Sequence, residues 1–129
     1  DPAPRHELAA LLMDEGDYRG AIQQLKEVVR LEPSGFDGWL DLGICYAQKG
    51  FYAEADRAYA RARKLRPEDL LLNYNAAALF ALWGRPRQAI EALEKAVAAD
   101  AAKVRGWLAH DPMFEALEGT PEFERLARG

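Results

Sequence analysis

The stretch FDGWLDLGICYAQKGFYAEADRAYARARKLRPED, residues 36 to 69, decides the fold. In its first half, Trp39, Leu42 and Tyr46 stand at i, i+3 and i+7, so they share one face of a helix. Gly50 follows, and glycine adopts the left-handed conformation that ends a helix at little cost. The first half of the stretch therefore predicts one amphipathic helix with a defined end.

The second half of the stretch predicts another helix, packed back on the first. Ala55, Tyr59 and Ala62 fall at i, i+4 and i+7, and Pro67 disfavours helical geometry at the residue before it. Small side chains at Gly43 and Ala55 would let the two helices approach closely where they cross. The stretch as a whole predicts an antiparallel helix hairpin.

The pattern returns every 34 residues, before and after this stretch. A hairpin of this kind cannot bury its apolar face alone, so stacked neighbours share one core. Glycine, alanine and large apolar side chains all keep the same phase in three copies. The residues in phase are Gly16, Gly50 and Gly84; Ala21, Ala55 and Ala89; Leu12, Tyr46 and Phe80; and Leu25, Tyr59 and Leu93.

The signature W-x2-L-G-x2-Y, a glycine turn, A-x3-aromatic and a closing proline resembles the tetratricopeptide repeat (TPR). The resemblance implies an all-α fold, a TPR-type right-handed α-solenoid of antiparallel helix hairpins with short C-terminal capping helices. We expect a single domain over residues 1–129. Its parts are repeat 1 at about 2–35, repeat 2 at about 36–69, repeat 3 at about 70–103 and a C-terminal cap at 104–129.

The third repeat and the tail depart from the signature. Ala101 replaces the closing proline, so the second helix of repeat 3 could run on toward Lys103. Beyond it, Asp111-Pro112 and Thr120-Pro121 each place a capping residue before a proline, which predicts two short helices. The tail resembles the closing segment after the last repeat in some bacterial TPR proteins.

Composition excludes several classes of function. The net charge of −4 comes without a basic block, which argues against nucleic acid as a partner. No run of 18 apolar residues exists, so we expect no membrane insertion. Cys45 is the single cysteine and is expected to be buried. The chain begins with Asp1 rather than methionine, a start that a processed or excised piece of a longer protein would have, and the sequence leaves open whether this chain is one.

The sequence offers no constellation for catalysis or metal binding. His6 and His110 have no ligand partner at metal spacing, and Asp37 and Asp41, one helical turn apart, are read as an acidic patch. No nucleophile elbow, phosphate-binding loop or dinucleotide motif appears. We therefore expect no enzyme activity, no cofactor and no metal.

The resemblance implies that the first helix of each repeat lines a concave groove. The predicted partner is another protein, presenting an apolar helix or extended segment with some basic character. The basic clamp with which some TPR proteins hold a C-terminal carboxylate is missing. By register the groove residues are His6, Ala10, Met13, Asp37, Leu40, Asp41, Ile44, Ala47, Gln48, Leu71, Tyr74, Asn75, Ala78 and Ala81.

Two alternatives to this adaptor reading stay open at the level of sequence. One is a self-associating scaffold whose groove receives another copy of the chain. The other is a regulatory part of a larger enzyme or of a secretion or assembly component. Phe51 and Trp83, beside the turns, are expected to pack against a neighbouring repeat, with an exposed anchor as the alternative.

Overall fold

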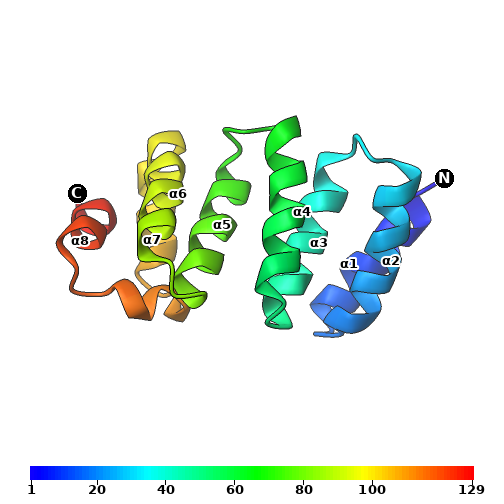
Figure 1. Cartoon of the computed structure of the whole chain (residues 1–129), viewed down its shortest axis with the longest axis horizontal. Coiled ribbons are helices and arrows are strands. Elements are labelled where there is room, and N and C mark those ends of the chain that lie inside the picture. The colour runs from blue at the N-terminus through cyan, green and yellow to red at the C-terminus, as the bar shows by residue number, and fades with distance from the viewer. The chain divides into compact units, whose positions relative to one another are not determined.

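The computed structural model describes residues 1–129 and contains helices and no strands (Figure 1). The all-α prediction is confirmed. The helices form two compact units, Asp1–Pro67 and Glu68–Gly129. Unit 1 holds α1 (Ala3–Asp14), α2 (Tyr18–Leu31), α3 (Phe36–Gln48) and α4 (Tyr52–Leu65), and unit 2 holds α5 (Leu70–Leu82), α6 (Pro86–Ala99), α7 (Ala101–Leu108), the 3-10 helix η1 (Pro112–Leu117) and α8 (Pro121–Arg128).

The predicted hairpins are present in both units. In unit 1, α1 packs on α2, α2 on α3, and α3 on α4, while in unit 2 α5 packs on α6. At the start of α2, the Asp17 carboxylate accepts a hydrogen bond from the amide of Gly20 at 2.9 Å. This is the N-cap that satisfies one of the donors left over at a helix start.

Each hairpin turns through a glycine at positive φ, and the hydrogen bonds around the three glycines are the same. Gly50 has φ of 80°, and its amide donates to the carbonyl of Ala47 at 3.0 Å, while the Phe51 amide donates to the carbonyl of Tyr46 at 2.9 Å. These two bonds define a Schellman turn. The rings of Tyr46 and Phe51 meet edge to face at 6.4 Å and add the apolar contact typical of this turn.

Gly43 lies where α3 and α4 cross. A methyl group placed there would stand 2.4 Å from Cε1 of Tyr59, closer than any real side-chain contact. The Tyr59 ring is fully buried at this crossing. Burial raises the pKa of its hydroxyl well above the ordinary value. The glycine is therefore required by the close approach of the two helices.

Unit 1 has a continuous core built from α1 to α4. Leu25, Leu42 and Cys45 are buried in it, and Met13 and Trp39 pack against it from its edge. The expected burial of Cys45 is confirmed, and burial raises the pKa of its thiol to about 12. The Trp39 indole N–H donates to the carbonyl of Pro33 at 2.8 Å, which ties this signature residue to the loop between the hairpins.

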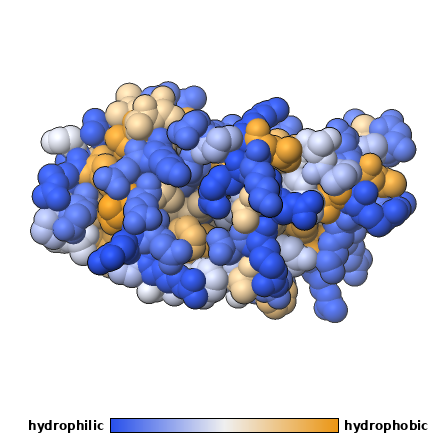
Figure 2. Space-filling view, turned by 45° about the horizontal axis from the view of Figure 1, so that its top comes forward, coloured by the Kyte–Doolittle hydropathy of each residue, from blue (hydrophilic) through white to orange (hydrophobic).

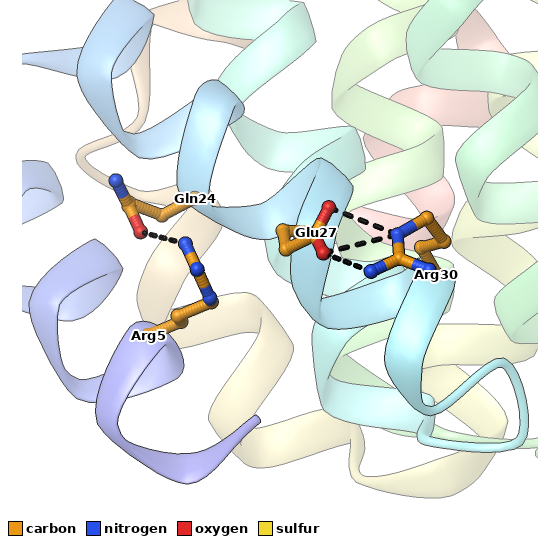
Figure 3. A network of polar contacts seen from close by, with 4 residues as sticks. All are labelled: Arg5, Gln24, Glu27 and Arg30. Carbon is orange, nitrogen blue, oxygen red and sulfur yellow. Dashed lines mark hydrogen bonds and ion pairs between the residues drawn. The ribbon is translucent and has the colours of Figure 1, made fainter. Parts of the chain in front are cut away.

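The outer surface of α1 and α2 carries polar contacts, shown in Figure 3. Arg5 occupies the place of the signature tryptophan in repeat 1, and its guanidinium donates to Oε1 of Gln24 at 3.3 Å. One turn further along α2, the guanidinium of Arg30 binds the carboxylate of Glu27. This hydrogen bond lowers the pKa of Glu27. Both contacts are exposed, so they add little to stability.

Unit 2 differs from the prediction at the end of repeat 3. The helix α6 does not continue toward Lys103 but ends at Ala99, because Asp100 adopts an extended conformation with φ −161° and ψ 90°. Its carboxylate accepts from the amide of Lys103 at 3.1 Å and starts α7. An N-cap aspartate thus replaces the missing proline as the helix stop.

The two proline-led segments of the tail form as predicted, although they differ in their caps. Asp111 caps η1 by accepting from the amide of Met113 at 3.0 Å. Thr120 precedes α8 but makes no side-chain cap; its hydroxyl instead donates to the carbonyl of Leu117 at 2.8 Å. In unit 2, η1 packs on α5, and α8 packs on α6 and α7.

The surface is mixed in character. Figure 2 shows one face on which hydrophilic side chains surround smaller hydrophobic patches. Large apolar side chains that remain exposed include Leu11, Phe51 and Leu71. No helix has both the length and the hydropathy needed to span a membrane.

Candidate functional site

In unit 1, the predicted groove residues of α1 and α3 lie next to each other. Nε2 of His6, on α1, stands 2.9 Å from Oδ2 of Asp41, on α3. The repeat register assigns both residues to the groove but does not by itself show their pairing, because they belong to different repeats. The register itself contains the signal, since it gives the two residues adjacent positions on neighbouring first helices.

The Asp41 carboxyl is partly buried beside this histidine. Burial raises its pKa above the ordinary value, and the hydrogen bond from His6 offsets only part of that effect. Asp37, one helical turn away and exposed, adds a small like-charge contribution in the same direction. The acidic patch expected from the sequence is thus a hydrogen-bonded aspartate next to a solvated one.

The face of α1 and α3, called here the α1/α3 face, offers both apolar and polar side chains to solvent. Its centre is apolar, and carboxylates lie toward one end. Leu40 is only 5% exposed, so it packs beneath the surface residues of the face and is not part of its accessible surface. Ala10, Asp37 and Gln48 are exposed; His6, Met13, Asp41 and Ile44 are half-buried; Ala47 is buried.

A polar pocket of about 300 Å³ borders this face in unit 1. Its lining includes His6, Asp37 and Arg66. The guanidinium of Arg66 lies 4.7 Å from the centre of the Phe36 ring, a cation–π geometry that holds the cation beside the pocket. The end of the α1/α3 face can therefore hydrogen-bond to a polar group of either charge.

In unit 2, the corresponding face of α5 is covered by the tail. Tyr74 is 8% exposed, and its ring contacts those of Trp107 at 4.9 Å and Phe114 at 5.4 Å. Its hydroxyl donates to Oδ2 of Asp111 at 2.6 Å. The pKa of Tyr74 is raised above its ordinary range. Burial is the larger cause, and the hydrogen bond to the Asp111 carboxylate is the second. The repeat register assigns Tyr74 to the groove, but it does not predict this cover.

The other predicted groove residues of α5 differ among themselves. Leu71 is 49% exposed, and Asn75 is half-buried, with its amide donating to the carbonyl of Leu71 at 2.8 Å. Ala78 and Ala81 are buried. A charged side chain at a buried position such as Leu40 or Tyr74 would disturb packing as well as any partner. Substitutions that test binding therefore belong at exposed positions.

The α1/α3 face contains one histidine–carboxylate pair and no accessible thiol. The hydrogen bond to Asp41 orients the imidazole of His6. Cys45, the single cysteine, is buried, and its thiol stays protonated at neutral pH because its pKa is raised. No group of three or more His, Cys, Asp or Glu side chains is placed to hold a metal ion. His110 is exposed in unit 2.

Two sequence-family models match the chain. Both are described as tetratricopeptide repeats, and they cover residues 6–69 and 71–103. Among curated proteins, Superkiller protein 3 of Schizosaccharomyces pombe is 30% identical over 91 residues, which is 70% of this chain and 7% of that protein. The chain spans less than a tenth of the length of the curated relatives it matches.

Solved structures show the same fold at low identity. The crystal structure of MamA matches with a TM-score of 0.83 and 22% identity, covering 98% of this chain and 74% of that one. The Yersinia enterocolitica type III secretion chaperone SycD, in complex with a peptide of the translocator YopD, matches with a TM-score of 0.71 and 20% identity, covering 97% and 82%. With three glycine-turned hairpins in register and two family models over most of its length, the chain belongs to the tetratricopeptide repeat family.

Proposed function

We propose that the chain is a protein-interaction module whose α1/α3 face binds a helix or extended segment of a partner protein. The observation that carries this proposal is the face itself. Half-buried Met13 and Ile44 and exposed Ala10 give it an apolar centre, and Asp37 and Asp41 give it an acidic end. Such a surface suits an apolar segment that carries basic side chains.

The fold supports a binding role of this kind. SycD, which shares the fold, is seen in complex with a peptide of YopD. The apolar anchors of a bound segment would lie over Ile44 and Met13, because these side chains are the half-buried apolar surface of the face. A basic side chain of the partner would then reach Asp37, which is exposed and has no ion-pair partner within the chain.

The tail of unit 2 illustrates the binding chemistry within the chain. There η1 lies on α5 through the tilted contact between the rings of Phe114 and Tyr74 and through the hydrogen bond from Tyr74 to Asp111. Partner binding at Tyr74 would first require η1 to leave, whereas the α1/α3 face is accessible as it stands. We therefore place the binding surface on unit 1, without a catalytic step and without a cofactor.

The test compares two double substitutions that add the same charge. Ala10→Arg with Gln48→Arg places bulk and positive charge on the α1/α3 face, and both positions are exposed. The matched control, Ala60→Arg with Gln88→Arg, makes the same exchanges at exposed positions of α4 and α6. Each variant and the unchanged chain are used to capture proteins from a lysate of the source cells, and their helicity is compared by circular dichroism.

The proposal predicts a protein that the unchanged chain and the control retain and the face variant loses. A synthetic segment of that protein should then bind the unchanged chain in calorimetry, at least tenfold more tightly than it binds the face variant. If the face variant retains every protein that the control retains, the α1/α3 face is not the binding surface.

A further inference from the structure

An exposed aromatic side chain in unit 1 stands among positive charges. Phe51 follows the second glycine turn and is 48% exposed. It borders a shallow hollow of about 440 Å³ whose charged lining residues are Arg19, Lys26 and Lys49, with no carboxylate. None of the three cations forms an ion pair within the chain. In a protein of net charge −4, this concentration of positive charge is unusual. Phe51 with these three residues is called the basic knob.

Unit 2 carries a surface of the opposite character. A hollow of about 540 Å³ lies between α6 and the tail, with Ile90 and Leu117 as apolar lining. Glu91, Glu94 and Glu122 surround it, and Arg87 is its single cation. The three glutamates are exposed and form no ion pair within the chain. This surface is called the acidic hollow.

The two surfaces use the same part of the repeat. Ile22 of the first hollow becomes Ile90 in the second, two repeat lengths later. In the same step, Lys26 becomes Glu94, and neutral Gln23 becomes Glu91. Corresponding positions on the second helices of repeats 1 and 3 thus keep their apolar floor and change their charge. Repetition of the hairpin explains the floor but not the opposite charges.

We propose that the basic knob of one copy of the chain docks into the acidic hollow of a second copy. The Phe51 ring would lie on Ile90 and Leu117. The hollow has room for it, because an apolar cavity of about 150 Å³ is enough to bind benzene. Lys26 and Lys49 would face Glu91 and Glu94, and the opposite charges would fix the orientation of the contact. The proposal concerns surfaces outside the α1/α3 face, so it is independent of the function proposed above.

The contact joins two different surfaces, so it is heterologous. Each copy has one knob and one hollow, and a contact of this type builds a ring if the rotation closes or an open chain if it does not. The acidic hollow, rather than another protein, is chosen as the site for the knob because the two match in three respects: the exposed ring against an apolar floor, three cations against three carboxylates, and the same place on the repeat.

Charge reversal on either side tests the contact with the full chain. Lys26→Glu with Lys49→Glu makes the knob acidic, and Glu91→Lys with Glu94→Lys makes the hollow basic. The control, Lys64→Glu with Lys103→Glu, changes the net charge by the same amount as the knob variant at positions outside both surfaces. Sedimentation equilibrium measures the mass of each protein from roughly micromolar to roughly millimolar concentration, at about 50 mM and about 500 mM salt, since salt screens exposed charges.

The unchanged chain and the control should rise from 14.4 kDa to at least about twice that mass at low salt, and less so at high salt. Each reversed variant alone should stay at the mass of one copy. An equal mixture of the two reversed variants should recover the association, because each then meets a surface of opposite charge. A chain that is monomeric at every concentration overturns the proposal. So does association that survives either reversal, or a mixture that stays monomeric.

Discussion

The two units of the molecule treat the same face of the repeat in different ways. In unit 1, Asp41 on α3 pairs with His6 of the preceding repeat, and the side chains around them remain accessible. In unit 2, Tyr74 on α5 pairs with Asp111 of the tail and is buried. The polar partner comes from the N-terminal side in one unit and from the C-terminal side in the other. The neighbouring segment of the chain, rather than the repeat itself, decides whether the face of a repeat is free.

The largest expected effect comes from removing the cover of α5. Phe114→Ala deletes a buried ring that contacts Tyr74 at 5.4 Å and Phe123 at 6.0 Å. It should lower the free energy of unfolding by about 3 to 5 kcal/mol, the usual cost of such a truncation. Urea unfolding followed by circular dichroism measures this loss, and amide hydrogen exchange should rise across η1. Met113→Ala, at a half-buried residue of η1, should lower the free energy of unfolding clearly less than Phe114→Ala does.

In unit 1, the crossing of α3 and α4 can be disturbed at Gly43. Gly43→Leu should cost about 1 to 3 kcal/mol, because the new side chain would overlap the buried Tyr59 ring. Gly106→Ala in α7 serves as control, since a methyl group there meets no atom within 4 Å and alanine favours helix by up to about 1 kcal/mol. Urea midpoints should move in opposite directions for the two variants. Equal midpoints would contradict the close packing of α3 and α4.

Tyr74→Phe removes the hydroxyl of Tyr74 and keeps its ring, so it measures the contribution of the hydroxyl alone. Loss of the hydrogen bond to Asp111 should cost about 1 kcal/mol at neutral pH, because Asp111 can turn to water. The raised pKa of Tyr74 means that the folded state keeps a proton that the unfolded state releases above about pH 10. Stability is therefore lost as the pH rises above 10. The phenylalanine variant should lose less over that range in urea titrations, and an identical pH dependence would count against the buried hydroxyl.

The smallest effect is expected at the counterpart pair in unit 1. Because the folded-state pKa of Asp41 is raised, the folded protein binds more protons than the unfolded chain from about pH 3.8 upward, until the carboxyl ionises. Stability is present below that range and is lost as the pH rises through it. Asp41→Asn removes this loss and should slightly raise the thermal midpoint at pH 7, with no gain near pH 3. A lower midpoint at pH 7 would show that the charge of Asp41 stabilises the fold.

Most of the fold was predictable because the repeat is a local pattern. The glycine turns could be located from spacing alone, and the structure gives Gly16, Gly50 and Gly84 a similar positive φ and the same pair of hydrogen bonds. The sequence prediction does not include the break at Asp100, because it takes Ala101 in place of the closing proline as the loss of a helix stop. An aspartate that caps a new helix ends the previous one equally well.

The candidate site was less predictable because it depends on contacts between segments far apart in sequence. The register assigns Tyr74 to the groove face of α5, but nothing in the sequence of repeat 3 shows that Asp111 and Phe114 fold back onto it. For Phe51 the sequence favours packing against a neighbouring repeat, with an exposed anchor as the alternative, but the structure shows its ring against Tyr46 of its own repeat and 48% exposed. The division into one domain over residues 1–129 stays a prediction, which a single urea transition would support.

The three turn glycines occupy a backbone conformation that favours D-amino acids over L-amino acids. At Gly16, Gly50 and Gly84 the backbone has positive φ, and a side chain would meet no atom within 4 Å. An L-alanine there would be strained by roughly 1 to 2 kcal/mol, whereas positive φ is the natural conformation of a D-residue. A chain made by chemical synthesis with D-alanine at these positions would keep its turns and have fewer unfolded conformations. Each of the three repeats therefore contains one place where a mirror-image amino acid fits better than a natural one.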